Sequence, residues 1–197
     1  MSTESNRARL VAEARRLFSA KGFAEVSVDE VATAAGLTKG AVYYQFKDKT
    51  DLFKAACEAL VADIGHYVDQ ASMGVTEHAI EEIVTGGQTW LDAYESPETR
   101  RMLLIDGPAV LGVEQWTALQ EPVGMGLIAH ALGHLADEGL LEAEVIPSLS
   151  QLLFGAFVQG ALRIGASANP QTTSSEVRRA TRALTQGLLA GAGRTRA

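Results

Sequence analysis

Small and polar residues that suit contact with a polyanion are concentrated between positions 38 and 49. They comprise Thr38, Lys39, Gly40, Ala41, Tyr43, Tyr44, Gln45 and Lys49. At the start of a helix, free N–H groups attract phosphate, and small Gly40 and Ala41 would let that helix approach a groove closely. Tyrosine hydroxyls commonly hold phosphates, while a glutamine amide can donate and accept at an adenine edge. These residue types, in this order, indicate contact with double-stranded DNA.

The elements that must position these residues are two short helices joined by a tight turn. Ser27 and Glu30 have the spacing of a capping box, in which each side chain satisfies the other's free N–H group. Gly36 marks the turn, and Thr38 can cap a second helix that runs to about Phe46. This is the helix-turn-helix arrangement, with Ser27 added to the expected DNA contacts. Lys49 then falls in the first turn of a further helix capped by Asp48, where the helix dipole also favours phosphate.

The alternative role for the two tyrosines is packing, and one of them is expected to pack in part. Val42 and Phe46 are better core candidates, because their spacing points them at the helix expected over residues 7–21. That helix has one apolar stripe, formed by Leu10, Val11, Ala14, Leu17 and Phe18.

The rest of the chain has helical periodicity and no sustained period-two pattern, so an all-α fold is expected. A long helix begins near Lys49. Further helices are expected over 76–94, from Ser96-Pro97 to about 106, over 122–140, over 148–168, and over 174–190 from a second capping box, Thr173 to Glu176. Residues 107–113 are expected to be irregular. The acidic pair Glu81-Glu82 and the basic trio of Arg178, Arg179 and Arg182 are interpreted as solvated faces.

Charge is distributed unevenly along the 197 residues. The net charge is −7, yet residues 1–54 contain nine Lys and Arg against seven Asp and Glu. A mildly basic head on an acidic body suggests that only the head approaches phosphate. The N-terminus lacks a signal-peptide pattern, no apolar run reaches membrane-span length, and Cys57 is the single cysteine. A cytoplasmic protein without a membrane partner is expected, with Cys57 as a small buried side chain.

Residues 7–60 resemble the TetR family of bacterial regulators, with no gap needed. The resemblance is carried by Ala14-Arg-Arg-Leu-Phe18, Lys21-Gly-Phe23, Ser27-Val28, Val31-Ala32, Ala34-Ala-Gly36, Thr38 to Tyr44, Phe46 and Lys49 to Phe53. It implies that the Lys49 position contacts the DNA backbone. Family members often have His after the paired aromatics, where this chain has Gln45, so no operator sequence carries over.

The resemblance implies a three-helix helix-turn-helix domain, placed at residues 5–52, and a helical effector-binding and dimerisation domain, placed at 53–193. The last two long helices would form the dimer interface of a homodimer that reads a palindromic operator. Both carry small residues that permit close helix approach: Gly155, Ala156, Gly160, Ala161, Ala180, Ala183 and Gly187. An intramolecular hairpin is the alternative role for this pair.

A pocket for a small, mainly apolar or aromatic effector is expected among large apolar residues of the body, with no charge-rich pocket signature. The candidates are Trp90, Tyr94, Met102, Leu103, Asp106, Trp116, Met125, Ile128, Phe154 and Phe157, each of which could equally be core. The segment from Asp106 to Gly112 is either a gate to this pocket or a plain connection. His130 and His134 have metal-ligand spacing but no third ligand nearby in sequence, so no metal or other cofactor is expected.

The expected function is a ligand-responsive regulator, with repressor favoured over activator. An enzyme is disfavoured, because the chain has no phosphate loop, nucleophile elbow, Cys-x-x-Cys or His-Glu-x-x-His motif. An architectural or protein-interaction module that has kept the fold without sequence-specific DNA binding is the third hypothesis.

Overall fold

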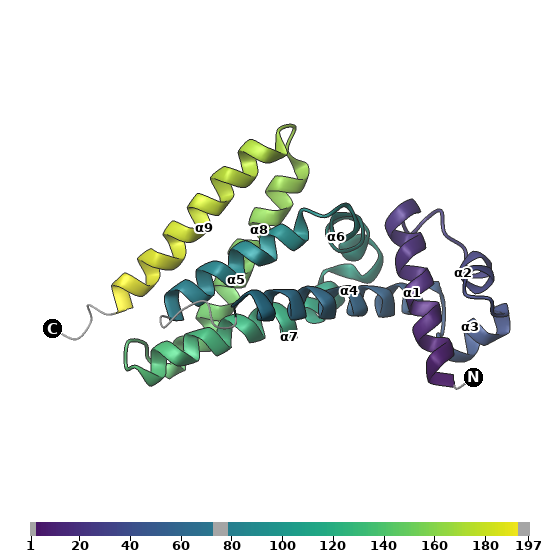
Figure 1. Cartoon of the computed structure of the whole chain (residues 1–197), viewed down its shortest axis with the longest axis horizontal. Coiled ribbons are helices and arrows are strands. Elements are labelled where there is room, and N and C mark those ends of the chain that lie inside the picture. Colours follow the sequence, from purple (N-terminus) through teal and green to yellow (C-terminus); the bar gives the residue numbers. More distant parts are fainter. Residues whose placement is uncertain (1–2, 73–78, 193–197) are drawn as a thin grey trace. The chain divides into compact units, whose positions relative to one another are not determined.

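The computed structural model describes residues 3–72 and 79–192, in which every regular element is helical (Figure 1), so the expected all-α class is confirmed. The α-helices are α1 (Thr3–Lys21), α2 (Val28–Ala34), α3 (Lys39–Gln45), α4 (Lys49–Ser72), α5 (Ala79–Tyr94), α6 (Pro97–Thr99), α7 (Gly107–Asp137), α8 (Ile146–Ala166) and α9 (Pro170–Ala192). A π-helix, η1 (Arg100–Asp106), joins α6 to α7, and a 3₁₀ turn, η2 (Ala143–Val145), precedes α8.

The chain divides into two compact units that do not follow the order of the sequence. One comprises Met1–Asp63 with Ser96–Leu119, and the other comprises Ile64–Glu95 with Gln120–Ala197. Helices α4 and α7 each contribute to both units. The expected domain boundary after residue 52 falls near the start of α4, and it stays a prediction.

The core of the first unit is built on the predicted face of α1. Its five predicted apolar residues, Leu10 to Phe18, are all buried. The Phe18 ring meets the Phe53 ring edge-on, with centroids 5.1 Å apart, and Phe23 completes the aromatic cluster. Helix α1 begins at Thr3, earlier than expected, and ends at Lys21, followed by Gly22, whose φ of 86° suits glycine.

Helices α6 and η1, over residues 97–106, pack against α1 in the same unit. Ser96 accepts a hydrogen bond from the Thr99 N–H at 3.1 Å, so the predicted cap is confirmed. From α6, Glu98 receives the Arg15 guanidinium at 2.6 Å. At the end of η1, the Asp106 carboxylate accepts the backbone N–H of Phe23 at 2.8 Å. These contacts therefore stabilise the end of α1 and the residues that follow it.

The expected irregularity of residues 107–113 is confirmed only at Gly112. Helix α7 starts at Gly107 and continues past Pro122, so the helix expected over 122–140 begins earlier than predicted. Only Gly112 departs from helical geometry, with φ 77° and ψ 158°. Glycine alone adopts such angles without strain, so the sequence signal for a loop marks a one-residue kink. Pro108 lies two residues after the end of η1, and its missing N–H removes one hydrogen bond where the π-helix continues into α7.

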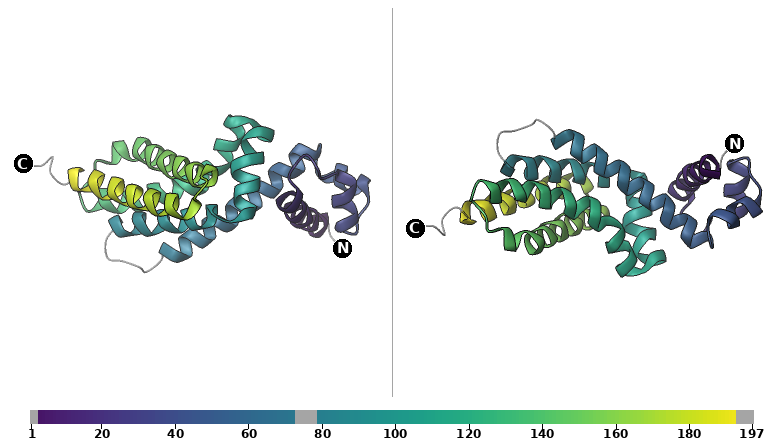
Figure 2. Two further views of the ribbon diagram at one scale, coloured as in Figure 1. Left: turned by 90° about the horizontal axis from the view of Figure 1, so that it is seen from above. Right: turned by 90° about the horizontal axis from the view of Figure 1, so that it is seen from below.

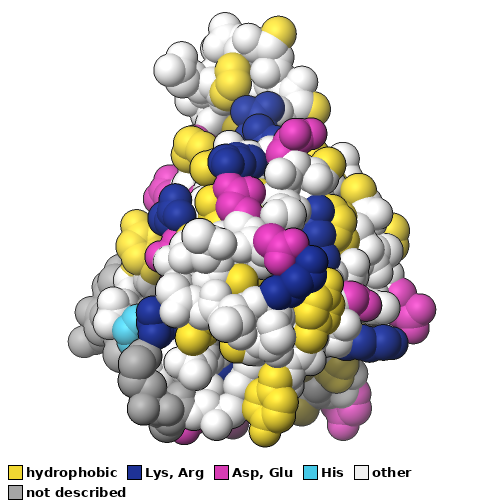
Figure 3. Space-filling view, turned by 90° about the vertical axis from the view of Figure 1, so that its right-hand side faces the viewer, with side chains coloured by type: hydrophobic (Ala, Val, Ile, Leu, Met, Phe, Trp, Pro, Cys, Tyr) yellow, Lys and Arg dark blue, Asp and Glu magenta, His cyan; other side chains and the backbone are white. Residues whose placement is uncertain are grey.

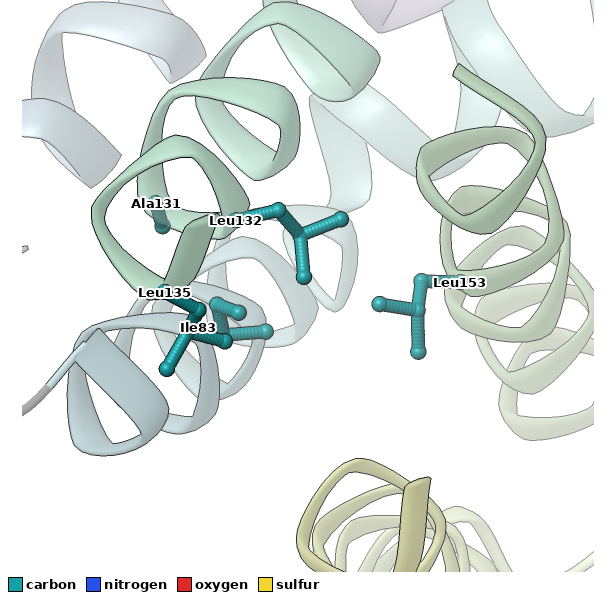
Figure 4. Close-up of a cluster of buried hydrophobic side chains, with 5 residues drawn as sticks. All are labelled: Ile83, Ala131, Leu132, Leu135 and Leu153. Carbon is teal, nitrogen blue, oxygen red and sulfur yellow. The ribbon is translucent and has the colours of Figure 1, made fainter. Parts of the chain in front are cut away.

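A hydrophobic cluster from α5, α7 and α8 forms a core of the second unit (Figure 4). Its buried members are Ile83, Ala131, Leu132, Leu135 and Leu153. Helices α8 and α9 lie side by side and antiparallel (Figures 1 and 2). A Cβ atom on Gly160 would lie 2.7 Å from Val177 Cγ1, so this glycine lets the two helices approach closely.

The predicted capping box at Thr173 is wrong, because α9 already begins at Pro170. Proline supplies a helical φ at the first position, and the Thr173 N–H bonds to the Asn169 carbonyl at 3.2 Å. Glu176 instead pairs with Arg163 of α8 at 3.0 Å.

The expected solvated face at Arg178 is wrong, because Arg178 pairs with Asp92 of α5 at 2.7 Å and with Glu95, just after α5, at 2.6 Å. Helix α8 presents side chains to two different surroundings, since Leu152 is 71% exposed while the adjacent Leu153 is buried.

Candidate nucleic-acid interface

Local hydrogen bonds fix the two short helices and the turn between them. The Ser27 hydroxyl accepts the Glu30 N–H at 3.1 Å, and the Thr38 hydroxyl accepts the Ala41 N–H at 3.2 Å. Gly36, with φ 63°, makes the turn between them. Both predicted caps are therefore confirmed, as is the helix-turn-helix connection they bound.

Helix α3 divides cleanly into a buried and an exposed face. Val42 and the following Phe46 are buried, as predicted. Tyr43 and Tyr44 are 51% and 80% exposed, so neither is chiefly a core residue. Lys39 and Gly40 are exposed and Ala41 is half-buried at the N-terminal end. A Cβ on Gly40 would meet only Thr38 Oγ1, at 3.8 Å, so no bulky side chain covers this end of the helix.

Acidic neighbours partly neutralise the basic residues of the head. Lys39 Nζ lies 2.7 Å from Asp29 Oδ2, and this hydrogen bond raises the pKa of Lys39 above its ordinary value. Lys21 lies 2.5 Å from Glu30, and its hydrogen bond lowers the pKa of that carboxyl. Lys and Arg side chains alternate with Asp and Glu over the face drawn in Figure 3. The head therefore offers separate cations rather than one basic patch.

Two more of the predicted contacts, Gln45 and Lys49, also have partners within the chain. Lys49 Nζ lies 4.3 Å from the centroid of the Phe23 ring and donates to the Ala24 carbonyl at 3.3 Å. The Gln45 amide donates to the Thr3 carbonyl at 3.4 Å, a long and exposed hydrogen bond. Both would have to exchange these bonds for DNA, a modest cost because each side chain is only half-buried.

A second candidate site is a cavity of about 50 Å³ within the second unit. Aromatic and aliphatic side chains line most of it, among them Trp90, Ile128, Phe154 and Phe157. The polar lining residues come from three helices: Asp69, Ser72, Glu82 and His130. Two carboxylates and one imidazole therefore accompany the mainly apolar lining of this cavity. Sequence spacing could not reveal this set, because only the packing of α4, α5 and α7 brings it together.

Close contacts at two glycines seat the phenylalanine rings of this cavity. A Cβ on Gly87 would lie 2.1 Å from Phe157 Cζ, and one on Gly124 would lie 2.1 Å from Phe154 Cε2. The Trp90 ring stacks on Tyr94 with centroids 3.7 Å apart and meets Phe154 edge-on at 6.0 Å. The cavity walls are thus tightly packed.

Family models match both parts of the chain. The model described as bacterial regulatory proteins, tetR family, matches residues 10–56, and the tetracyclin repressor-like C-terminal domain matches residues 80–188. This chain belongs to the TetR family. The predicted family resemblance and the helix-turn-helix fold are confirmed.

Curated relatives of this TetR-family chain are similar to it mainly at the N-terminus. The regulator AcrR of Shigella flexneri is 44% identical over 62 residues, which are 32% of this chain and 29% of AcrR. SrpR of Pseudomonas putida is 30% identical over 101 residues, which are 50% of this chain and 44% of SrpR. The chain thus matches less than half the length of either relative.

Solved structures match this chain over nearly its whole length. A TetR-family transcriptional regulator from Pectobacterium atrosepticum is 26% identical with a TM-score of 0.80, and the match covers 94% of this chain and 95% of that one. RolR in complex with resorcinol has a TM-score of 0.74 at 17% identity, covering 98% and 95% of the two chains. The latter likeness shows the fold alone.

The ten predicted effector contacts of this TetR-family chain do not all lie together. Four line the cavity: Trp90, Ile128, Phe154 and Phe157. Tyr94, which hydrogen-bonds Gln120, and half-buried Met125 do not line the cavity. The others lie in the first unit, where Met102 and Leu103 are fully buried, Asp106 holds Phe23, and the Trp116 indole donates to the Leu103 carbonyl at 2.6 Å.

Proposed function

We propose that this chain is a DNA-binding transcriptional regulator that uses α3 to read its operator. The exposed face of α3 carries the proposal, since Lys39, Tyr43 and Tyr44 project from a helix whose opposite face is locked into the core. Tyr43, Tyr44 and Lys39 would hold phosphates and Gln45 would reach a base edge. Ser27, Thr38, Gly40, Ala41 and Lys49 are the further proposed contacts, through hydroxyl or backbone groups and through the dipole of α4.

Selection of binding sites from a random duplex library tests this function. We expect an enriched palindrome bound at least about 10³-fold more tightly than random duplex at physiological salt. Tyr43→Ala and Lys39→Ala should each weaken that binding, while Tyr67→Ala, a change at an equally exposed tyrosine on α4, serves as control. Equal affinity for selected and random duplex would instead favour the architectural module.

The exposed surface of α8 and α9 supports a homodimer. Leu152 on α8 and Leu184 on α9 are exposed, and Cβ atoms on Gly155 and Gly187 would meet nothing within 4 Å. Within residues 143–166, an 18-residue stretch has a mean hydropathy of 1.5, so it matches a membrane span by length and composition, and only 28% of that stretch is buried. We propose that a second copy covers this face, which would place two heads about 34–36 Å apart for one DNA turn.

The oligomeric state distinguishes a dimer interface on α8 from a membrane-binding role of that helix. Leu152→Arg should convert the dimer to a monomer in light scattering and reduce operator affinity. Val113→Arg is the matched control, since Val113 is 70% exposed and lies on α7. A wild-type chain that is monomeric and partitions into vesicles would contradict the dimer and the cytoplasmic location together.

We further propose that the cavity takes a small, mainly apolar or aromatic effector that releases the operator, as expected of a repressor. Its volume is far below the roughly 300–1,000 Å³ of a drug-sized ligand site, so a ligand must be small or displace the Phe154 and Phe157 rings. The Asp69, Ser72, Glu82 and His130 side chains would bind a polar group on such a ligand. A coupling of about 1–3 kcal/mol between effector and operator binding is typical.

A small aromatic diol such as resorcinol, which RolR binds, is a suitable first probe. In a Trp116→Phe variant, only Trp90 reports by fluorescence, because the chain has two tryptophans. Resorcinol, phenol and indole should be titrated against this variant with and without selected operator. A compound that binds at Trp90 yet leaves operator affinity unchanged would contradict the regulatory part.

A further inference from the structure

Three side chains that commonly ligate metals meet on the surface of the second unit. His130 and His134 lie one turn apart on α7, with ring centroids separated by 4.7 Å. Glu82 reaches them from α5, and its Oε2 lies 3.1 Å from His134 Nδ1. One ligand atom from each residue lies within 4.8 Å of the other two. Glu82 supplies the third ligand that the sequence around the two histidines lacks.

The hydrophobic core holds the backbone of all three residues in place. Ile83 follows Glu82, Ala131 follows His130 and Leu135 follows His134 in the sequence, and these followers are all buried members of the cluster in Figure 4. Because each ligand is adjacent to a core anchor, the three Cα positions cannot separate without opening that core. The site is therefore preorganised at the backbone, and only side-chain rotation remains.

The chemistry of this set suits a borderline divalent ion. Two imidazoles and one carboxylate bind Zn²⁺ at about 2.0–2.2 Å and leave a coordination position open. Tetrahedral bonds of that length put ligand atoms about 3.3 Å apart, which modest rotation from the observed separations would give. The His134 side chain is 46% exposed and that of Glu82 is 23% exposed, so both have room to turn.

We propose that Glu82, His130 and His134 form a binding site for a divalent transition-metal ion, with zinc as the representative ion. Glu82 and His130 also line the cavity, so the ion would lie at its edge. The alternative is a simple hydrogen bond between Glu82 and His134 with no metal role. The metal site is independent of the proposed DNA-binding function, because zinc binding can be read without DNA.

Zinc titration of the full chain, free of any affinity tag, against a micromolar-affinity chromogenic chelator tests the site. We expect one zinc ion per chain. Glu82→Gln, His130→Gln and His134→Gln should each weaken zinc binding by about tenfold or more. Matched controls are Glu81→Gln, at the exposed neighbour on α5, and His66→Gln, at a histidine that hydrogen-bonds Gln70 on α4. Both controls should bind zinc as the wild type does.

Cobalt substitution supplies a readout that does not depend on the variants folding. Co²⁺ bound to the wild-type chain should show visible d–d absorption, and one equivalent of Zn²⁺ should abolish it. Absence of stoichiometric zinc binding, absence of the cobalt bands, or equal weakening in the controls and the three site variants would each overturn the proposal. Operator binding measured in parallel reports separately on the regulator function.

Discussion

The Asp106 carboxylate accepts the backbone N–H of Phe23 at 2.8 Å, across 83 residues of sequence. Phe23 follows Gly22 at the corner after α1, and its ring packs against Phe18 and Phe53 in the head. This hydrogen bond connects the end of η1 to the corner after α1, within the unit that also contains α3. Within this unit, a displacement of η1 would act directly on the helix-turn-helix through one charge-assisted hydrogen bond.

Asp106→Ala should lower the free energy of unfolding by about 1–3 kcal/mol, because it leaves the half-buried Phe23 N–H without its acceptor. Urea unfolding monitored by circular dichroism measures the loss. Asp106→Asn keeps an acceptor oxygen and should lose less. Equal stability of the Ala variant and the wild type would show that water replaces the carboxylate at no cost.

Asp29→Asn should strengthen DNA binding, because it frees the Lys39 ammonium from an ion pair at 2.7 Å. Removing the negative charge also raises the net charge of the surface next to α3. We expect tighter binding at low salt and a steeper dependence of log affinity on log salt, by up to about one phosphate contact. Glu13→Gln, in the ion pair with Arg16 on α1, makes the same charge change on a different helix. If both variants behave alike, net charge rather than Lys39 accounts for the effect.

Gly124→Ala should destabilise the second unit by about 1–3 kcal/mol, since its Cβ would lie 2.1 Å from the Phe154 ring. Gly126→Ala on the same helix is the control, because its Cβ meets nothing within 4 Å. That substitution should be neutral or stabilise by up to about 1 kcal/mol through helix propensity. Thermal unfolding of the two variants measures the contrast. A Gly124→Ala variant as stable as Gly126→Ala would mean that Phe154 moves aside freely.

Cys57 should be inert in the folded chain, since burial raises the pKa of its thiol to about 12. At pH 8 the native protein should react with a disulfide reagent far more slowly than the same protein in urea. Above about pH 8.5 the unfolded chain loses the thiol proton while the folded chain keeps it, so stability should fall as pH rises through that range. Rapid labelling of the native protein would contradict this assignment.

Local patterns in the sequence were enough for the head. The caps at Ser27 and Thr38, the turn at Gly36 and the buried stripe of α1 depend on contacts within a few residues or on helical period, so they could be predicted. The core roles of Val42 and Phe46 followed from the same spacing. By contrast, the predicted start of α9 at Thr173 was wrong, because the helix already begins at Pro170, three residues earlier.

Tertiary structure alone decided which distant residues share a site. Helical period placed His130 and His134 on one face, but only the packing of α5 against α7 adds Glu82. Helix packing likewise brings Trp90, Phe154 and Phe157 together at one cavity. Asp106 and Trp116, which were predicted for the same pocket, belong instead to the unit that contains the head. The spacing of apolar residues in a sequence determines which face of each helix is buried. Which faces meet depends on packing summed over the whole chain, and that sum has no local signature.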